Sequence, residues 1–265
     1  MDPRDPAVPD LLRRGRIDIT GRLVDASNAT LFGTVGLDGV EVQCVYKPVR
    51  GERPLWDFPD GTLAGREVAA FLVSEAAGFD VVPQTILRQD GPFGPGMMQV
   101  WVDTDDEREL VDVCAPKKVP AGWLGVLRAR GDRGEPAVLA HADTPALKRM
   151  AAFDVVVNNA DRKGGHVLAG TDGHLYGVDH GLTMHVEDKL RTVLWGWVGQ
   201  PLPADVVEAL EKLRTELDGT FLDVLGEHIT RRETRTLVAR VAALLDDPRY
   251  PEPSGYGPAI PWPAF

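Results

Sequence analysis

Two aspartates and a histidine are spaced along one stretch of the chain in a way that suits phosphoryl transfer. His166 follows Asp161 by five positions, and Asp179 lies thirteen positions further on, before a histidine and a glycine. A carboxylate such as Asp161 can accept the proton of an attacking hydroxyl, while His166 and Asp179 can hold the metal ions that neutralise a triphosphate. Because Asp and Gly are also common turn residues, the pattern gains its weight from the segments that precede it.

A lysine and a glutamate upstream fit the same chemistry. Lys47 ends a run of alternating apolar and polar residues, and Glu67 lies twenty residues later in an expected helix. A lysine that contacts the α- and β-phosphates needs an anion to hold it, and a glutamate on a packed helix provides one. The alternative is a surface lysine on an edge strand and a solvated glutamate. The order of strand lysine, helix glutamate, hairpin, Asp161 and Asp179 along the chain favours the first interpretation.

Two segments are candidates for the rest of a nucleotide site. Ser27 and Asn28 occupy a turn that would cover the phosphates, although a plain hairpin turn has the same composition. The turn is not glycine-rich, so the contacts would come from these side chains and from backbone N–H groups. Where the two expected lobes join, Gln99, Trp101 and Val102 could offer groups to an adenine. A connector between lobes that bound no nucleotide would have the same composition.

The elements that position these residues change in character along the chain. Apolar residues at helical spacing predict a helix over 63–77, which Gly78 suits as a C-terminal stop, and Asp38-Gly39 is typical of a hairpin turn. The other strands of the front half are expected within residues 15–47, near 81–88 and near 97–102.

From about Asp103 the pattern becomes helical. The helices expected there are 145–158, one around 206–217 and one around 237–245, with short strands near 167–168 and 176–178. We therefore predict an α+β protein of two lobes, a β-rich N-lobe (1–102) and a mainly helical C-lobe (103–265), with a nucleotide cleft between them. The proline-rich tail from Pro248 is either disordered or laid over the surface by its aromatic residues, and the second interpretation is slightly favoured.

Composition excludes several classes of protein. The net charge of −11 argues against a nucleic-acid binder and against a polybasic lipid anchor. The first residues lack the apolar segment of a signal peptide, and no run of about 18 apolar residues exists, so a cytoplasmic protein is expected. The sequence does not decide the oligomeric state.

Several segments together resemble the phosphatidylinositol 3-/4-kinase superfamily, most closely the type II phosphatidylinositol 4-kinase branch. The similarity runs in collinear order over roughly residues 22–200. The matching segments are Val45-Tyr-Lys-Pro48, Arg66-Glu-Val-Ala-Ala70, Ser74-Glu-Ala-Ala-Gly78, Val82-Pro-Gln-Thr85, Asn159-Ala-Asp-Arg162, Val178-Asp-His-Gly-Leu182 and Trp195-Gly-Trp197.

This resemblance implies a two-lobed, protein/lipid-kinase-like fold that uses ATP with Mg²⁺ or Mn²⁺. By position, Lys47 would bind phosphate and Glu67 would orient it, while Asp161 would be the catalytic base and Asp179 the main metal ligand. Lys163 falls where lipid kinases place a basic group near the γ-phosphate, which implies a stabilising role.

The chain departs from the family at His166, where asparagine is usual. A neutral imidazole favours borderline metals over Mg²⁺, which prefers hard oxygen ligands. Three interpretations stay open: His166 binds Mn²⁺, contacts phosphate, or marks an impaired enzyme. The cysteine-rich palmitoylation segment of the animal lipid kinases is also missing, so lipid attachment is unsupported.

The function that the sequence predicts is phosphoryl transfer from ATP to a hydroxyl of a soluble protein or small molecule. A nucleotide-binding pseudokinase scaffold is the alternative from a non-enzyme class, favoured by His166 and by the glycine-poor turn. Transfer of AMP on the same fold is a third possibility, which sequence does not distinguish.

Overall fold

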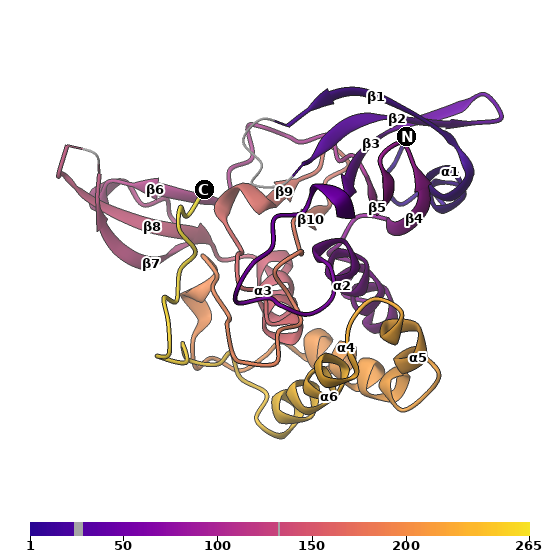
Figure 1. The fold of residues 1–265 in the computed structure, drawn as a ribbon. Coiled ribbons are helices and arrows are strands. Elements are labelled where there is room, and N and C mark those ends of the chain that lie inside the picture. Colours follow the sequence, from indigo (N-terminus) through magenta and orange to yellow (C-terminus); the bar gives the residue numbers. More distant parts are fainter. Residues whose placement is uncertain (24–28, 132) are drawn as a thin grey trace.

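The computed structural model describes residues 1–23, 29–131 and 133–265. Strands dominate the first part of the chain, and most helices gather in the second (Figure 1). This arrangement confirms the predicted α+β class. The predicted turn at Ser27 and Asn28 lies outside the described residues.

A five-stranded antiparallel sheet in the order β1-β2-β3-β5-β4 lies at the upper right of the molecule in Figure 1. Its strands are β1 (Arg16–Arg22), β2 (Leu31–Leu37), β3 (Val40–Pro48), β4 (Thr85–Gly91) and β5 (Gly94–Val100). The turn between β2 and β3 has Asp38 at φ 52° and Gly39 at φ 81°, the left-handed conformations that a tight hairpin requires. Because β3 lies between β2 and β5, Lys47 belongs to an interior strand and not to an edge strand.

A short N-terminal helix that the sequence pattern did not predict packs against this sheet. Helix α1 (Val8–Arg14) buries Val8, Leu11 and Leu12 in the sheet's core. With seven residues it is too short to show a clear period, so its stability comes from this packing.

Helix α2 (Leu63–Ala77) has the bounds that the apolar period predicts, and it connects the two halves of the protein. The Thr62 side chain accepts a hydrogen bond from the Gly65 N–H, and Gly78 ends the helix at φ 75°. Val68 packs with Met97 of β5, whereas Phe71 and its neighbours join the large core of the second half.

The region after Asp103 forms three strands before its first α-helix, which corrects the sequence prediction. A second antiparallel sheet, in the order β6-β8-β7, projects from the body of the protein (Figure 1). Its strands are β6 (Val111–Cys114), β7 (Trp123–Arg130) and β8 (Pro136–Ala142). Gly125 interrupts β7 at a register shift, and much of that strand stays exposed, so its alternation is weak in the sequence.

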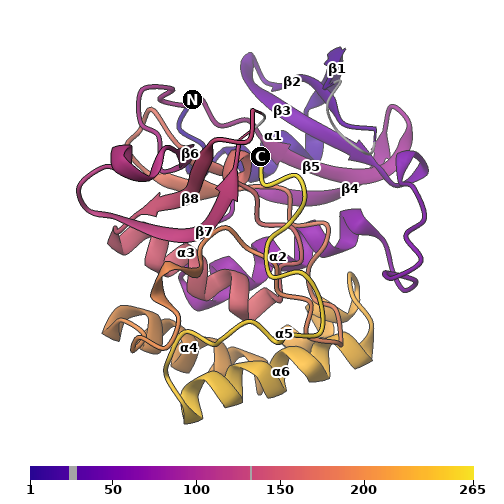
Figure 2. The same ribbon diagram turned by 90° about the vertical axis from the view of Figure 1, so that its left-hand side faces the viewer.

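The remaining helices form the lower part of the molecule, with α4, α5 and α6 beneath α2 and α3 (Figure 2). They are α3 (Pro145–Val157), α4 (Ala204–Leu217), α5 (Phe221–Gly226) and α6 (Arg231–Asp246). Between α3 and α4 lie the two short strands β9 (Val167–Ala169) and β10 (Leu175–Gly177), which pair antiparallel. Single 3₁₀ turns are formed by Val49–Gly51, Pro116–Lys118, Gly164–His166 and Trp195–Trp197.

The C-terminal tail runs back from α6 across the molecule (Figure 2). Tyr250 is buried and donates its hydroxyl to the Lys148 carbonyl at 2.9 Å, while Tyr256 and Trp262 are 96% and 91% exposed. The tail therefore lies over the surface, as the sequence favoured. Tyr250 and main-chain hydrogen bonds hold it there, whereas Tyr256 and Trp262 do not.

Candidate active site

The β9–β10 hairpin brings two distant loops together. Val167 pairs with Gly177, and the Val178 N–H donates to the His166 carbonyl at 3.1 Å. The loop before β9, with Asp161 and His166, therefore lies beside the residues that follow β10, with Asp179. The pairing of β9 with β10 thus places Asp161, His166 and Asp179 on one side of the hairpin's open end.

Lys47 lies between two carboxylates. Its Nζ is 2.7 Å from Glu67 Oε1 and 2.7 Å from Asp179 Oδ1. Glu67 is 1% exposed, so it is not a solvated helix residue, and its other oxygen accepts the His180 N–H at 2.8 Å. Strand β3, helix α2 and the loop after β10 thus meet at one ammonium group.

These charges shift one another's pKa values. Burial alone would lower the pKa of Lys47, but Asp179 and Glu67 outweigh burial and raise it. Lys47 in turn holds the pKa of Asp179 well below its usual range. Burial raises the pKa of Glu67, and the nearby Lys47 cancels only part of this increase. Lys47 and Asp179 are therefore both charged at neutral pH.

Asp161, His166 and Asp179 could together hold a metal ion. One ligand atom from each lies within 4.8 Å of the others. His166 Nδ1 is 2.9 Å from the Asp161 carbonyl, which can only accept, so Nδ1 carries the proton and Nε2 has a free lone pair. Burial lowers the pKa of His166 to about 4, which keeps the ring neutral. Its Nε2 then faces Asp179 Oδ2 at 3.4 Å, an approach of two acceptors that a cation between them would stabilise.

Asp161 is in contact with Asn159 and Lys163, and its pKa is raised. Its main-chain N–H donates to Asn159 Oδ1 at 3.0 Å, and Lys163 Nζ lies 3.3 Å from Asp161 Oδ2. Burial raises the pKa of Asp161 and the negative charge of Asp179 adds to this, while Lys163 acts in the opposite direction. A carboxylate with a raised pKa is a better proton acceptor.

A buried arginine that sequence reasoning assigned no role organises both loops. Arg162 pairs with Asp154 of α3 at 2.8 Å, and both side chains are fully buried. Its Nη1 donates to the carbonyls of His166 and Val178 at 3.1 Å, and its Nη2 lies 2.7 Å from His180 Nε2. The signal was present in the sequence, because Asp154 stands on the apolar face of a predicted helix, where a charge needs a partner.

The residues predicted to bind adenine lie at and beyond the end of β5. The Gln99 side-chain amide donates to Thr85 Oγ1 at 2.8 Å, and the Trp101 N–H donates to the Gln43 carbonyl at 2.9 Å. Val102 is buried. The protein itself thus uses two of the polar groups there, and a nucleotide contact at this place stays a prediction.

The end of the C-terminal tail lies against the Asp161–His166 loop. The Gly164 N–H donates to the Ala264 carbonyl at 2.8 Å, and a Cβ at Gly164 would lie 2.2 Å from the Phe265 ring. The tail also accepts hydrogen bonds at the Ala259 carbonyl from the Thr192 N–H and from Trp195 Nε1. Only glycine permits this close approach beside Lys163.

Comparison with known proteins places the chain in a family. No family model matches it. It is 25% identical over 193 residues to phosphatidylinositol 4-kinase gamma 2 of Arabidopsis thaliana, in an alignment that covers 70% of this chain and 35% of the plant protein. It is 50% identical over 266 residues to Protein Rv2133c of Mycobacterium tuberculosis, covering 96% of this chain and 94% of that protein. The chain belongs to the family of Protein Rv2133c.

Solved structures also resemble the chain. The proinflammatory kinase CtkA of Helicobacter pylori aligns over 90% of this chain and 94% of its own, with a TM-score of 0.46 and 9% sequence identity.

In the part of the chain that the structure describes, none of the helices combines the length and the apolar character needed to cross a bilayer.

Proposed function

We propose that the protein is an ATP- and divalent-metal-dependent phosphotransferase of the phosphatidylinositol 3-/4-kinase superfamily, acting on a hydroxyl group. The observation that carries the proposal is the convergence of Asp161, His166 and Asp179 within 4.8 Å, beside a lysine that bridges Glu67 and Asp179. The similarity to a plant protein named as a phosphatidylinositol 4-kinase supports it.

The residues present fit a divalent cation. Asp179 Oδ2 and His166 Nε2 face each other as acceptors, and a carboxylate oxygen of Asp161 lies within the same 4.8 Å. An imidazole among the donors suits Mn²⁺ better than Mg²⁺. When bound, the cation would neutralise charge on the triphosphate of ATP. The nucleotide would lie between the five-stranded sheet and the second half of the chain, beside Gln99, Trp101 and Val102 and under the turn with Ser27 and Asn28.

Each charged side chain has a distinct role in this proposal. Lys47, held by Glu67, would contact the α- and β-phosphates. Asp161 would accept the proton of the attacking hydroxyl, and Lys163 would balance negative charge on the transferred group. The substrate would be a protein or small molecule that carries this hydroxyl.

The direct test is to incubate the purified protein with ATP and either Mg²⁺ or Mn²⁺, and to analyse the nucleotide products and the protein mass. We expect ADP or a phosphate-sized mass gain, absent in Asp161→Asn. An AMP-sized gain would replace the proposal with adenylyl transfer. A rise in melting temperature with ATP but no turnover would replace it with a nucleotide-binding pseudokinase.

Lys47→Met is expected to weaken ATP binding or turnover and also to lower stability. The variant leaves the Glu67 carboxylate buried without its cation, which costs on the order of 3 kcal/mol when a buried pair is broken. Activity assays and thermal melting measure the two effects. In the double variant Lys47→Met/Glu67→Gln the buried charge is gone, so stability should recover while activity stays low. If stability recovered together with activity, Lys47 would have only a structural role.

His166→Asn is expected to shift the metal preference from Mn²⁺ towards Mg²⁺, because it replaces an imidazole nitrogen by a harder amide oxygen. The ratio of Mn²⁺- to Mg²⁺-supported activity should fall on the order of tenfold. His174→Asn, a histidine paired with the Asp80 carbonyl, is the matched control. An unchanged metal profile in His166→Asn would place His166 outside the coordination shell.

A further inference from the structure

Two consecutive residues of α2 are buried charges with different partners. Arg66 and Glu67 are each 1% exposed. Successive residues point about 100° apart around a helix, so Glu67 reaches Lys47 while Arg66 reaches α6. A helix that carries two adjacent buried charges is fixed in rotation, because any turn about its axis would separate both from their partners.

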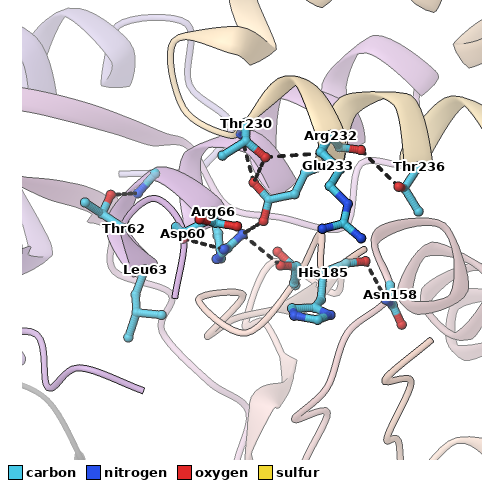
Figure 3. Close-up of polar contacts among 12 residues, drawn as sticks. Asp60, Thr62, Leu63, Arg66, Asn158, His185, Thr230, Arg232, Glu233 and Thr236 are labelled. Atoms are coloured by element: carbon cyan, nitrogen blue, oxygen red, sulfur yellow. Dashed lines mark hydrogen bonds and ion pairs between the residues drawn. The ribbon is translucent and has the colours of Figure 1, made fainter. Parts of the chain in front are cut away.

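Arg66 is the centre of a buried polar network (Figure 3). Its Nη1 pairs with Glu233 of α6 and its Nη2 donates to the Asp60 carbonyl at 2.6 Å. Glu233 is itself held by a capping box, since its Oε2 accepts the Thr230 N–H at 2.8 Å and the Thr230 hydroxyl at 2.9 Å. The acid that anchors Arg66 is therefore rigid.

The same arginine reaches the segment that follows Asp179. Arg66 Nη1 donates to the Thr183 carbonyl at 3.4 Å, and Glu67 Oε2 accepts the His180 N–H at 2.8 Å. The Thr183 hydroxyl closes the turn by donating to the His180 carbonyl at 2.8 Å. Residues 180–183 are thus bound at both ends by neighbouring side chains of α2.

Asp179 itself needs such support. Its φ of 60° lies in the left-handed region, which costs about 1–2 kcal/mol for residues other than glycine. Without the contacts at His180 and Thr183, the segment would be free to relax towards ordinary dihedral angles and would carry the Asp179 carboxylate away from Lys47.

We propose that Arg66, anchored by Glu233, is a positioning residue for Asp179. It fixes α2 and residues 179–183 relative to each other, so that Lys47, Glu67 and Asp179 meet in one geometry. The expected effect on metal–nucleotide binding rests on the function proposed above. The expected effect on the position of Asp179 does not.

The test compares Arg66→Met with Arg88→Met. Arg88, on β4, is also buried, but its side chain reaches the C-terminal end of α1, where it donates to the Leu12 and Gly15 carbonyls. Both variants should lose stability. Only Arg66→Met should speed amide hydrogen exchange at residues 180–183, by about tenfold or more, and weaken the binding of Mn²⁺–ADP by a similar factor.

Further variants separate positioning from folding. Arg66→Lys keeps a cation beside Glu233 and should recover part of the nucleotide affinity, and Glu233→Gln should resemble a mild form of Arg66→Met. If exchange at residues 180–183 is the same in Arg66→Met as in Arg88→Met, the proposal is wrong. If the native protein does not bind Mn²⁺–ADP, the proposed function fails, and the exchange measurement still decides whether Arg66 positions Asp179.

Discussion

Asp161→Asn is expected to reduce turnover of ATP by about 10²- to 10⁴-fold, the usual contribution of a general base, while metal-dependent nucleotide binding persists. The amide cannot accept a proton, so the chemical step loses its acceptor. Steady-state turnover and calorimetric titration with Mn²⁺–ADP measure the two quantities separately.

The loop itself should survive this substitution. Two contacts that shape it use main-chain atoms of residue 161, namely its N–H to Asn159 Oδ1 and its carbonyl to His166 Nδ1. Asparagine keeps both, and its side-chain oxygen can still face a cation. Asp223→Asn, at an exposed position on α5, controls for the change of charge. Normal turnover in Asp161→Asn would show that another group accepts the proton.

Local features of the fold could be predicted from the sequence because local interactions determine them. The apolar period and Gly78 gave α2 its bounds, and Asp38-Gly39 gave the β2–β3 turn. The second sheet (β6, β7, β8) was missed because none of its strands shows a clear alternation of buried and exposed residues. Strand β6 has four residues, β7 is largely exposed and β8 is buried along most of its length. Pairing between the strands therefore stabilises them more than any pattern within one strand does.

The contacts that organise the candidate site lie further apart in the chain. Arg66 and Glu233 are 167 residues apart, and Lys47 and Asp179 are 132 apart. The family resemblance placed Lys47 and Asp179 in one site, but it paired Lys47 with Glu67 and did not predict the contact between Lys47 and Asp179. The pair of Arg66 and Glu233 carried no signal at all, because each residue looks like an ordinary solvated charge on a helix. Such pairs become visible only when the arrangement of α2, α6, β3 and the loop after β10 in space is known.

The position of the C-terminal tail could also be predicted only in part from the sequence. Its aromatic residues suggested a segment held on the surface, yet Tyr256 and Trp262 are among the most exposed large apolar side chains of the described residues. The contact that matters to the site, between Phe265 and Gly164, depends on the missing side chain of a glycine. Nothing in the composition of the tail indicates which loop it meets.

Asp179→Asn is expected to abolish metal-dependent nucleotide binding. One oxygen of Asp179 faces the Lys47 ammonium and the other faces His166 Nε2, so the substitution removes the negative charge from the place where a cation would bind. Calorimetric titration of ATP with Mg²⁺, with Mn²⁺ and with a chelator measures the effect. Affinity in the variant should be no higher with either metal than with the chelator.

The fold should tolerate this change, so that an effect on binding can be assigned to the carboxylate itself. Residue 179 has φ 60°, and asparagine adopts this region more readily than most residues do. The His180 N–H and the Thr183 carbonyl, which hold the segment to α2, are main-chain groups and are retained. In the variant Lys47 keeps its ion pair with Glu67, so no buried charge is left without a partner. Lost affinity in a folded Asp179→Asn variant would therefore be due to the missing carboxylate and not to unfolding or a displaced loop. Unchanged metal-dependent affinity would rule out Asp179 as the metal ligand.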